Sequence, residues 1–158
     1  MRDRAQLDSL HSILLGADTL PDSVKIELAM RTIQYTVNYS LAYPTDSITP
    51  SYMFRRAQLF GAALNDPERA ATLFDEFNLK YPDYKMAPMS LLLASSAWEE
   101  AGNMAKAHNS LNNFIKLYPK HPWIPQAEGM IKQLDMKEAQ NRQSEDIVKE
   151  GRETKKKS

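Results

Sequence analysis

Apolar residues recur three and four positions apart along most of this chain, which is the spacing of one face of an α-helix. The pattern predicts helices over residues 2–15, 22–42, 50–64, 67–80, 88–101 and 104–117, and a last one that begins near Pro125. No stretch alternates apolar and polar residues with the period of two that marks a β-strand. The pattern therefore predicts an all-α protein of about seven helices.

Short polar sequences between the predicted helices indicate tight turns. Asp66 and Pro67 supply an N-cap and a first-turn proline for the helix that follows them. Gly102 can end one helix, and Asn103 can cap the next. Because short turns place consecutive helices antiparallel, we expect these helices to pack as hairpins.

A sequence of Tyr-Pro, five further residues and Pro occurs three times, and we call each copy an elbow. The elbows span residues 43–50, 81–88 and 118–125, so that successive tyrosines are 38 and 37 positions apart. The first proline is expected to end a helix, since the residue before a proline avoids the α region, and the second to open the next helix. Thr49 is the expected N-cap ahead of Pro50. A period in the thirties is typical of stacked helical repeats.

Two further positions repeat with the elbows. An apolar residue lies two positions before the last proline of each elbow: Ile48, Met86 and Trp123. An aromatic residue lies five positions before the first proline: Tyr39, Phe77 and Phe114. We expect the first set to pack beneath the elbows. Aromatic residues at helical spacing (Phe74, Phe77, Trp98 and Phe114) are expected to form core, since aromatics dominate core burial.

The third helix pair, residues 88–119, resembles a tetratricopeptide repeat. The resemblance rests on Ala94, Ser95, Trp98, Gly102, Ala107 and Pro119. The preceding pair matches at Ala57, Phe60, Ala70 and Pro82, with Asn65-Asp66 in place of the glycine turn. The resemblance covers roughly residues 22–134. The elbow makes the repeat longer than the usual length of about 34 residues, and this longer form resembles the repeats of bacterial envelope proteins such as BamD and YbgF.

The resemblance implies a right-handed α-α superhelix of about three repeats and a C-terminal capping helix. It also implies a non-catalytic scaffold whose concave groove binds a peptide or helix of a partner protein. Carried over by position, the groove is expected to be lined by Ser51, Phe54, Arg55, Gln58, Met89, Leu92, Ser96, Glu99, Gln126, Gln133 and Lys137. Phe54, Met89 and Leu92 are the expected apolar contacts.

Composition limits the remaining possibilities. The 158 residues suit a single domain over residues 1–150, followed by a disordered basic tail over residues 151–158. The net charge of zero does not favour nucleic-acid binding, and the absence of cysteine excludes disulfides and thiolate metal sites. No apolar run has the length of a membrane span, so contact with a membrane is expected to be indirect at most. No signal peptide is evident, but the numbering can begin at a trimmed start. The resemblance favours a periplasmic or outer-membrane-associated location, with the cytoplasm as the alternative.

No constellation of residues predicts catalysis. His11, His108 and His121 are far apart, and only His11 has a carboxylate, Asp8, at helical spacing, so no metal or cofactor is expected. The adjacent acidic pairs Asp75-Glu76 and Glu99-Glu100 diverge by about 100° on a helix and are expected to be solvated faces.

The sequence leaves two alternatives to a groove-binding scaffold open. One is a self-associating repeat protein, which would use an open end of its helix stack as the interface. The other is an enzyme whose repeats support a site that the sequence does not show. A pocket lined by converging acids or histidines would favour the enzyme.

Overall fold

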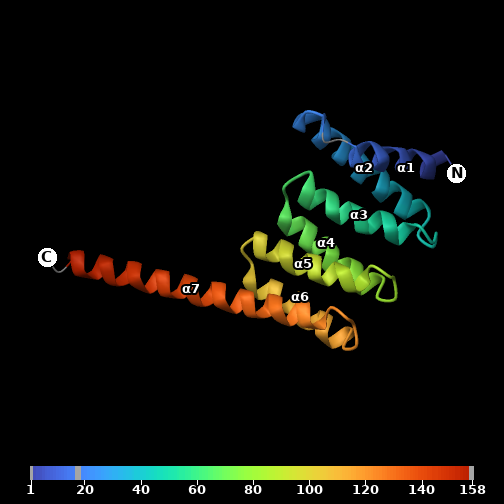
Figure 1. The fold of residues 1–158 in the computed structure, drawn as a ribbon. Helices are drawn as coiled ribbons and strands as arrows, with labels where there is room; N and C mark the ends of the chain where they lie inside the picture. The colour runs from blue at the N-terminus through green and yellow to red at the C-terminus, as the bar shows by residue number, and fades with distance from the viewer. Residues whose placement is uncertain (1, 17–18, 157–158) are drawn as a thin grey trace.

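The computed structural model of the protein describes residues 2–16 and 19–156 (Figure 1). These residues form seven α-helices and no strand: α1 (Arg2–Leu15), α2 (Asp22–Ala42), α3 (Thr49–Ala62), α4 (Pro67–Lys80), α5 (Ala87–Glu100), α6 (Met104–Leu117) and α7 (Ile124–Lys156). The predicted helices are confirmed, and their predicted and observed bounds differ by at most two residues, except at the end of α7.

The helices stack in chain order rather than closing into a bundle. Each helix packs chiefly against its neighbours in the sequence. The α1–α2 pair lies at one end of the stack and α7 at the other, with the second half of α7 extending away from the other helices (Figure 1). The described helices therefore form an all-α solenoid, as predicted.

The turns between paired helices follow the sequence signals. The Arg69 N–H donates to the Asp66 side chain at 3.0 Å, and the Lys106 N–H donates to the Asn103 side chain at 3.1 Å, so both expected N-caps are present. Gly102 has a φ of 77°, a left-handed conformation that glycine adopts without steric cost. Asn65 takes the corresponding place in the α3–α4 turn with a φ of 51°.

All three elbows have the same backbone structure. The C-cap tyrosines Tyr43, Tyr81 and Tyr118 have φ between −126° and −131° and ψ between 54° and 61°. In each elbow the tyrosine N–H donates to the carbonyl four residues earlier, and the N–H three residues later donates to the tyrosine carbonyl. Each pair of repeats is therefore joined by the same rotation, and residues 38 or 37 positions apart occupy equivalent places.

Aromatic packing supports each elbow from below. The ring of each C-cap tyrosine lies against the aromatic residue four positions earlier, with centroid distances of 4.8, 5.3 and 5.9 Å in the three elbows. Ile48, Met86 and Trp123 are partly buried and pack against core clusters, which confirms their predicted place beneath the elbows.

Two details differ from the sequence predictions. Ile48, not Thr49, takes the N-cap position of α3, and the Thr49 hydroxyl instead donates to the Tyr43 carbonyl at 2.7 Å across the elbow. The last helix, α7, runs on to Lys156, past Gly151, where a disordered tail was predicted to begin. Gly151 costs a helix only about 1 kcal/mol relative to alanine, and the surrounding lysine, glutamate and arginine residues favour helix. Residues 157 and 158 of the predicted tail lie outside the described residues.

The buried side chains form two separate clusters. The larger extends from α3 to α7 and contains the four aromatic residues predicted to be core. The smaller consists of Leu7, Tyr39 and Tyr52, with Tyr35 and Ile48 packed against it. Hydrogen bonds tie the smaller cluster together, because the Tyr52 hydroxyl donates to Asp8 at 2.8 Å and the Tyr39 hydroxyl donates to Asp46 at 2.6 Å. The α1–α2 hairpin is thus attached to α3 through a small cluster of mostly aromatic residues, whose tyrosine hydroxyls form hydrogen bonds.

Asp75 is part of the interior, which corrects the prediction of a solvated acidic face. Its carboxylate accepts hydrogen bonds from the Trp98 indole at 2.7 Å and from the Ser110 hydroxyl at 2.9 Å. Burial raises the pKa of Asp75, and the two hydrogen bonds and the charge of Lys106 oppose this rise. The carboxylate therefore joins α4 to both α5 and α6.

Asn78 joins the second elbow to the third. Its side chain is 2% exposed, and its amide donates to the Ala87 carbonyl at 2.9 Å and to the Tyr118 hydroxyl at 2.8 Å. The Tyr118 hydroxyl in turn donates to the Pro82 carbonyl at 3.1 Å. One buried amide thus satisfies groups from two consecutive elbows.

We expect Asn78→Ala to lower the free energy of unfolding by about 2–3 kcal/mol, because it leaves buried polar groups without partners. Asn112→Ala, at an exposed position on α6, is the control and should change stability by less than about 0.5 kcal/mol. Urea unfolding followed by circular dichroism measures both. Equal effects of the two substitutions would contradict the role given to Asn78.

Asp75 should make stability depend on pH in a predictable direction. Because its pKa is raised in the folded state, its contribution is fully present below the ordinary value of 3.8 and is lost as pH rises through the higher folded value. Asp75→Asn removes this dependence, so the variant should gain stability relative to the parent as pH rises from 4 to 7. Urea unfolding at several pH values tests this, with Glu76→Gln at the exposed neighbouring position as the control.

Candidate functional site

A cleft of about 800 Å³ lies where α1, α2 and α3 meet. It is lined by His11, Leu14, Leu15, Asp22, Lys25, Ile26, Arg55, Gln58, Leu59, Ala62 and Ala63. The end of α1, the start of α2 and the second half of α3 supply these residues. Arg55 and Gln58, two residues of the predicted groove, are therefore brought together with residues of the first helix pair.

The lining of the cleft is apolar at several points. Leu14, Leu59 and Ala63 are half-buried, while Leu15 and Ile26 remain 82% and 43% exposed. Exposed aliphatic side chains beside a concave surface are a common feature of protein-binding sites. The cleft can therefore accept an apolar side chain of another molecule.

Charged groups accompany this apolar surface. Lys25 forms an ion pair with Asp22, with 3.5 Å between its Nζ and the Asp22 Oδ1. Arg55 is half-buried. A ligand that fits the cleft would therefore combine an apolar group with polar groups at its edge.

His11 is the one buried titratable group of the cleft lining. Its ring is 6% exposed, stacks on Tyr52 at 5.7 Å, and donates from Nδ1 to the Leu7 carbonyl at 2.9 Å. Burial lowers the pKa of His11, with a smaller contribution from the charge of Arg55, so the imidazole is neutral at pH 7. Since Nδ1 is the donor in a neutral ring, the buried Nε2 is an acceptor that has no partner in the structure.

The other predicted groove residues continue along the first helices of the later pairs. Ser51, Met89 and Gln126 are equivalent positions of α3, α5 and α7, as are Gln58, Ser96 and Gln133. Ser51 and Met89 are half-buried, and the remaining four are exposed. The predicted residues therefore fall in rows that cross the stack.

Phe54 and Leu92 do not offer the apolar contacts predicted for them. They are 3% and 7% exposed, and both belong to the larger core cluster. The Phe54 ring lies edge-on to Phe74 and to Phe77, at 5.4 Å in each case. These two residues hold the first helices in place rather than forming an accessible surface.

Glu99 and Lys137 form an ion pair that joins α5 to α7. Both are residues of the predicted groove lining. Because the charge of each side chain is partly neutralised by the other, the ion pair is better described as a link between α5 and α7.

Two apolar residues at equivalent positions of α5 and α7 were not among the predicted groove residues. Leu93 and Met130 occupy the position of Arg55 in the next two units, and both are half-buried. The 38- and 37-residue offsets between elbows were sufficient to find them. Leu15 and Ile26 of the cleft had no comparable signal, since they belong to the least regular helix pair.

The histidines and acids do not assemble into a reactive site. His108 Nε2 lies 3.4 Å from Asp135 of α7, and the His121 ring packs against Phe114 and Trp123. Within residues 2–16 and 19–156, no group of three or more His, Asp or Glu side chains could hold a metal ion. In the same residues, no helix has the length and apolar character needed to cross a bilayer.

Comparison with known families identifies the repeats. The tetratricopeptide repeat profile matches residues 51–84 and residues 89–121, that is α3–α4 and α5–α6 with the start of the elbow that follows each pair. Among curated proteins, none is significantly similar to this chain. Tetratricopeptide repeats generally mediate protein–protein interaction and are typically non-catalytic. Residues 51–84 and 89–121 thus match the tetratricopeptide repeat family, within a helical stack that continues on both sides of them.

Proposed function

We propose that this protein is a non-catalytic scaffold that binds a peptide or helix of a partner protein, with the α1–α2–α3 cleft as its anchoring site. The cleft carries the proposal, because it is a concave surface with exposed aliphatic side chains and charged groups beside them. An amphipathic segment would place one apolar side chain in the cleft. Its polar side chains would face Arg55 and Gln58.

The row of first helices extends the proposed binding surface. From the cleft, a bound segment would follow α5 and α7 past Met89, Leu93 and Met130, which are half-buried. Ser96 and Gln133 are exposed beside this row and supply hydrogen-bonding groups. Apolar residues in the middle and polar residues at the margin are the usual composition of a protein interface.

We further propose that the scaffold belongs to an assembly of the bacterial cell envelope, in the periplasm or at the outer membrane. The support is the lengthened elbow, which resembles the repeats of envelope proteins such as BamD and YbgF. A cytoplasmic adaptor is the alternative. Recovery of the protein in the fraction released by osmotic shock or in the outer-membrane fraction, against a cytoplasmic marker protein, would support the envelope, and co-fractionation with the marker would exclude it.

Leu15 tests the cleft, and Leu79 provides a matched control. The two side chains are 82% and 81% exposed, but only Leu15 lines the cleft. Partners captured by the parent chain can be identified by mass spectrometry, and their affinity for each variant can then be measured by calorimetry. Leu15→Asp should weaken binding by about tenfold or more, since it places a charge against an apolar contact. Leu79→Asp should leave the affinity unchanged, and both variants should melt like the parent. Loss of binding in both variants, or in neither, would contradict the proposal.

A second candidate function is self-association through α2, and one observation favours it. Ile26, Met30, Ile33, Val37 and Leu41 follow one another at intervals of three or four residues, and none belongs to either core cluster. Met30 is 59% and Leu41 76% exposed. Such a stripe at the end of a helical stack can bury itself against a second copy.

Sedimentation velocity over a range of protein concentrations tests this candidate. Self-association through α2 predicts a dimer that Met30→Glu converts to a monomer, since it would bury an unpaired charge in the interface. Leu117→Glu is the control, because Leu117 is similarly exposed, at 52%, at the end of α6. A parent protein that is monomeric at every concentration would exclude self-association without affecting the scaffold proposal.

A further inference from the structure

An arginine occupies a packing position of the second helix pair. Arg56 of α3 is equivalent to Ala94 of α5, 38 positions later, and Ala94 is fully buried in the core. Arg56 is half-buried, and its Nε atom is buried without a hydrogen-bond partner. A charged side chain where the next repeat has alanine breaks the local pattern. Such breaks are expected at functional sites.

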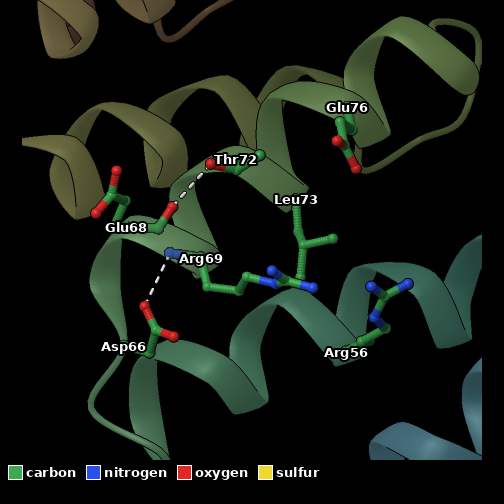
Figure 2. Close-up of a pocket in the computed structure, with 7 residues that line it drawn as sticks. All are labelled: Arg56, Asp66, Glu68, Arg69, Thr72, Leu73 and Glu76. Atoms are coloured by element: carbon green, nitrogen blue, oxygen red, sulfur yellow. Dashed lines mark hydrogen bonds between the residues drawn. The ribbon is translucent and has the colours of Figure 1, made fainter.

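A second arginine lies beside the first. Arg69 of α4 and Arg56 line one pocket of about 440 Å³. Figure 2 shows the Arg69 guanidinium beneath the side chain of Leu73 and the Arg56 guanidinium to the right of it. The Arg69 guanidinium also lies 5.5 Å from the centre of the Phe60 ring. Two cations therefore face the same space.

The next repeat shows what normally accompanies such a cation. Lys106 is equivalent to Arg69 and lies 3.9 Å from the centre of the Trp98 ring, just as Arg69 lies over Phe60. The Trp98 indole donates to the carboxylate of Asp75, so that junction has its own buried acid. The position equivalent to Asp75 is Val37. The junction of Arg56 and Arg69 therefore has no carboxylate at the position of Asp75, although Asp66, Glu68 and Glu76 line its pocket where the next repeat has Asn103, Ala105 and Asn113.

The acids that line the pocket do not neutralise the two arginines. The Asp66 carboxylate accepts from the Arg69 backbone N–H as the cap of α4. Glu68 and Glu76 are exposed, and Glu68 is directed away from the guanidinium groups in Figure 2. In the described part of the chain, neither arginine side chain takes part in an ion pair.

The electrostatics of Arg56 agree with this geometry. The pKa of Arg56 is lowered, first by burial and then by the charge of Arg69, and Glu76 offsets only part of this. The guanidinium group therefore lacks a full counter-charge within the protein.

We propose that Arg56 and Arg69 bind a single carboxylate group of a partner protein in the pocket between α3 and α4. The carboxylate would supply the acid that Asp75 supplies in the next junction. Two guanidinium groups can each donate charge-assisted hydrogen bonds to it. The nearby Glu68 and Glu76 disfavour highly charged anions, so the site suits one carboxylate. This site is distinct from the proposed anchoring cleft, because Arg55 lines the cleft and Arg56 lines the pocket.

Arginine Nε–Hε signals in ¹⁵N-labelled protein provide a direct readout. The probes are acetyl-Gly-Glu-Gly-amide, acetyl-Gly-Gln-Gly-amide and acetyl-Gly-Gln-Gly with a free carboxyl terminus, at constant ionic strength. A side-chain carboxylate ligand predicts saturable shifts of the Arg56 and Arg69 signals with the glutamate amide, and none with the glutamine amide. Stronger binding of the peptide with the free carboxyl terminus than of the glutamate amide would identify a chain-terminal carboxylate, rather than a side-chain carboxylate, as the preferred ligand.

Arg56→Ala separates binding from folding. Because alanine is the residue of the next repeat, the variant should melt at or above the parent temperature while its affinity for the better-bound carboxylate peptide falls by about tenfold, or ~1.4 kcal/mol. Arg142→Ala, on the exposed part of α7, should leave the affinity unchanged. Equal shifts with all three peptides, no shift with any, or unchanged affinity in Arg56→Ala would each overturn the proposal.

Discussion

The constant geometry of the elbow is the constraint on which this structure depends. Each elbow ends one helix and begins the next with the same backbone hydrogen bonds, and each is supported by an aromatic pair beneath it. Because proline fixes its own φ and removes a donor, both ends of the elbow are set by sequence. Each hairpin is therefore added with the same rotation, and side chains one period apart reach equivalent places. The core, the rows of first-helix residues and the differences between junctions all follow from that equivalence.

Equivalent positions of the repeats do not always have the same type of residue, and the α1–α2 hairpin is an example. Thr36 stands where later pairs have Phe74 and Leu111, both of which are buried. A buried threonine fills much less space than phenylalanine, so the hairpin cannot join the larger core. It is held instead by the smaller cluster and its hydrogen bonds. The cleft lies at this same junction, between the end of α1, the start of α2 and the second half of α3.

The elements of the fold were predictable because each rests on a local signal. Proline, asparagine, aspartate and glycine mark where helices begin and end, and their effects are nearly independent of the surroundings. The inward face of α2 was not predictable in this way. Its most apolar stripe contains Met30 and Leu41, yet the structure buries Thr32 and Thr36 on another face. The register set by the first elbow decides which face points inward, and it overrides local hydrophobicity.

The site residues were harder to predict for a related reason. Asp75 and Glu76 are adjacent and chemically alike, but only Asp75 points toward Trp98 and Ser110. Likewise Phe54 and Arg55 are neighbours on α3, and a shift of one residue decides whether a side chain enters the core or lines the cleft. A single residue is about 100° of rotation on a helix. Packing between helices therefore decides whether a residue lies in the core or on the surface. The repeat period helps to predict this only when each residue is compared with the residues at equivalent positions of the other helices.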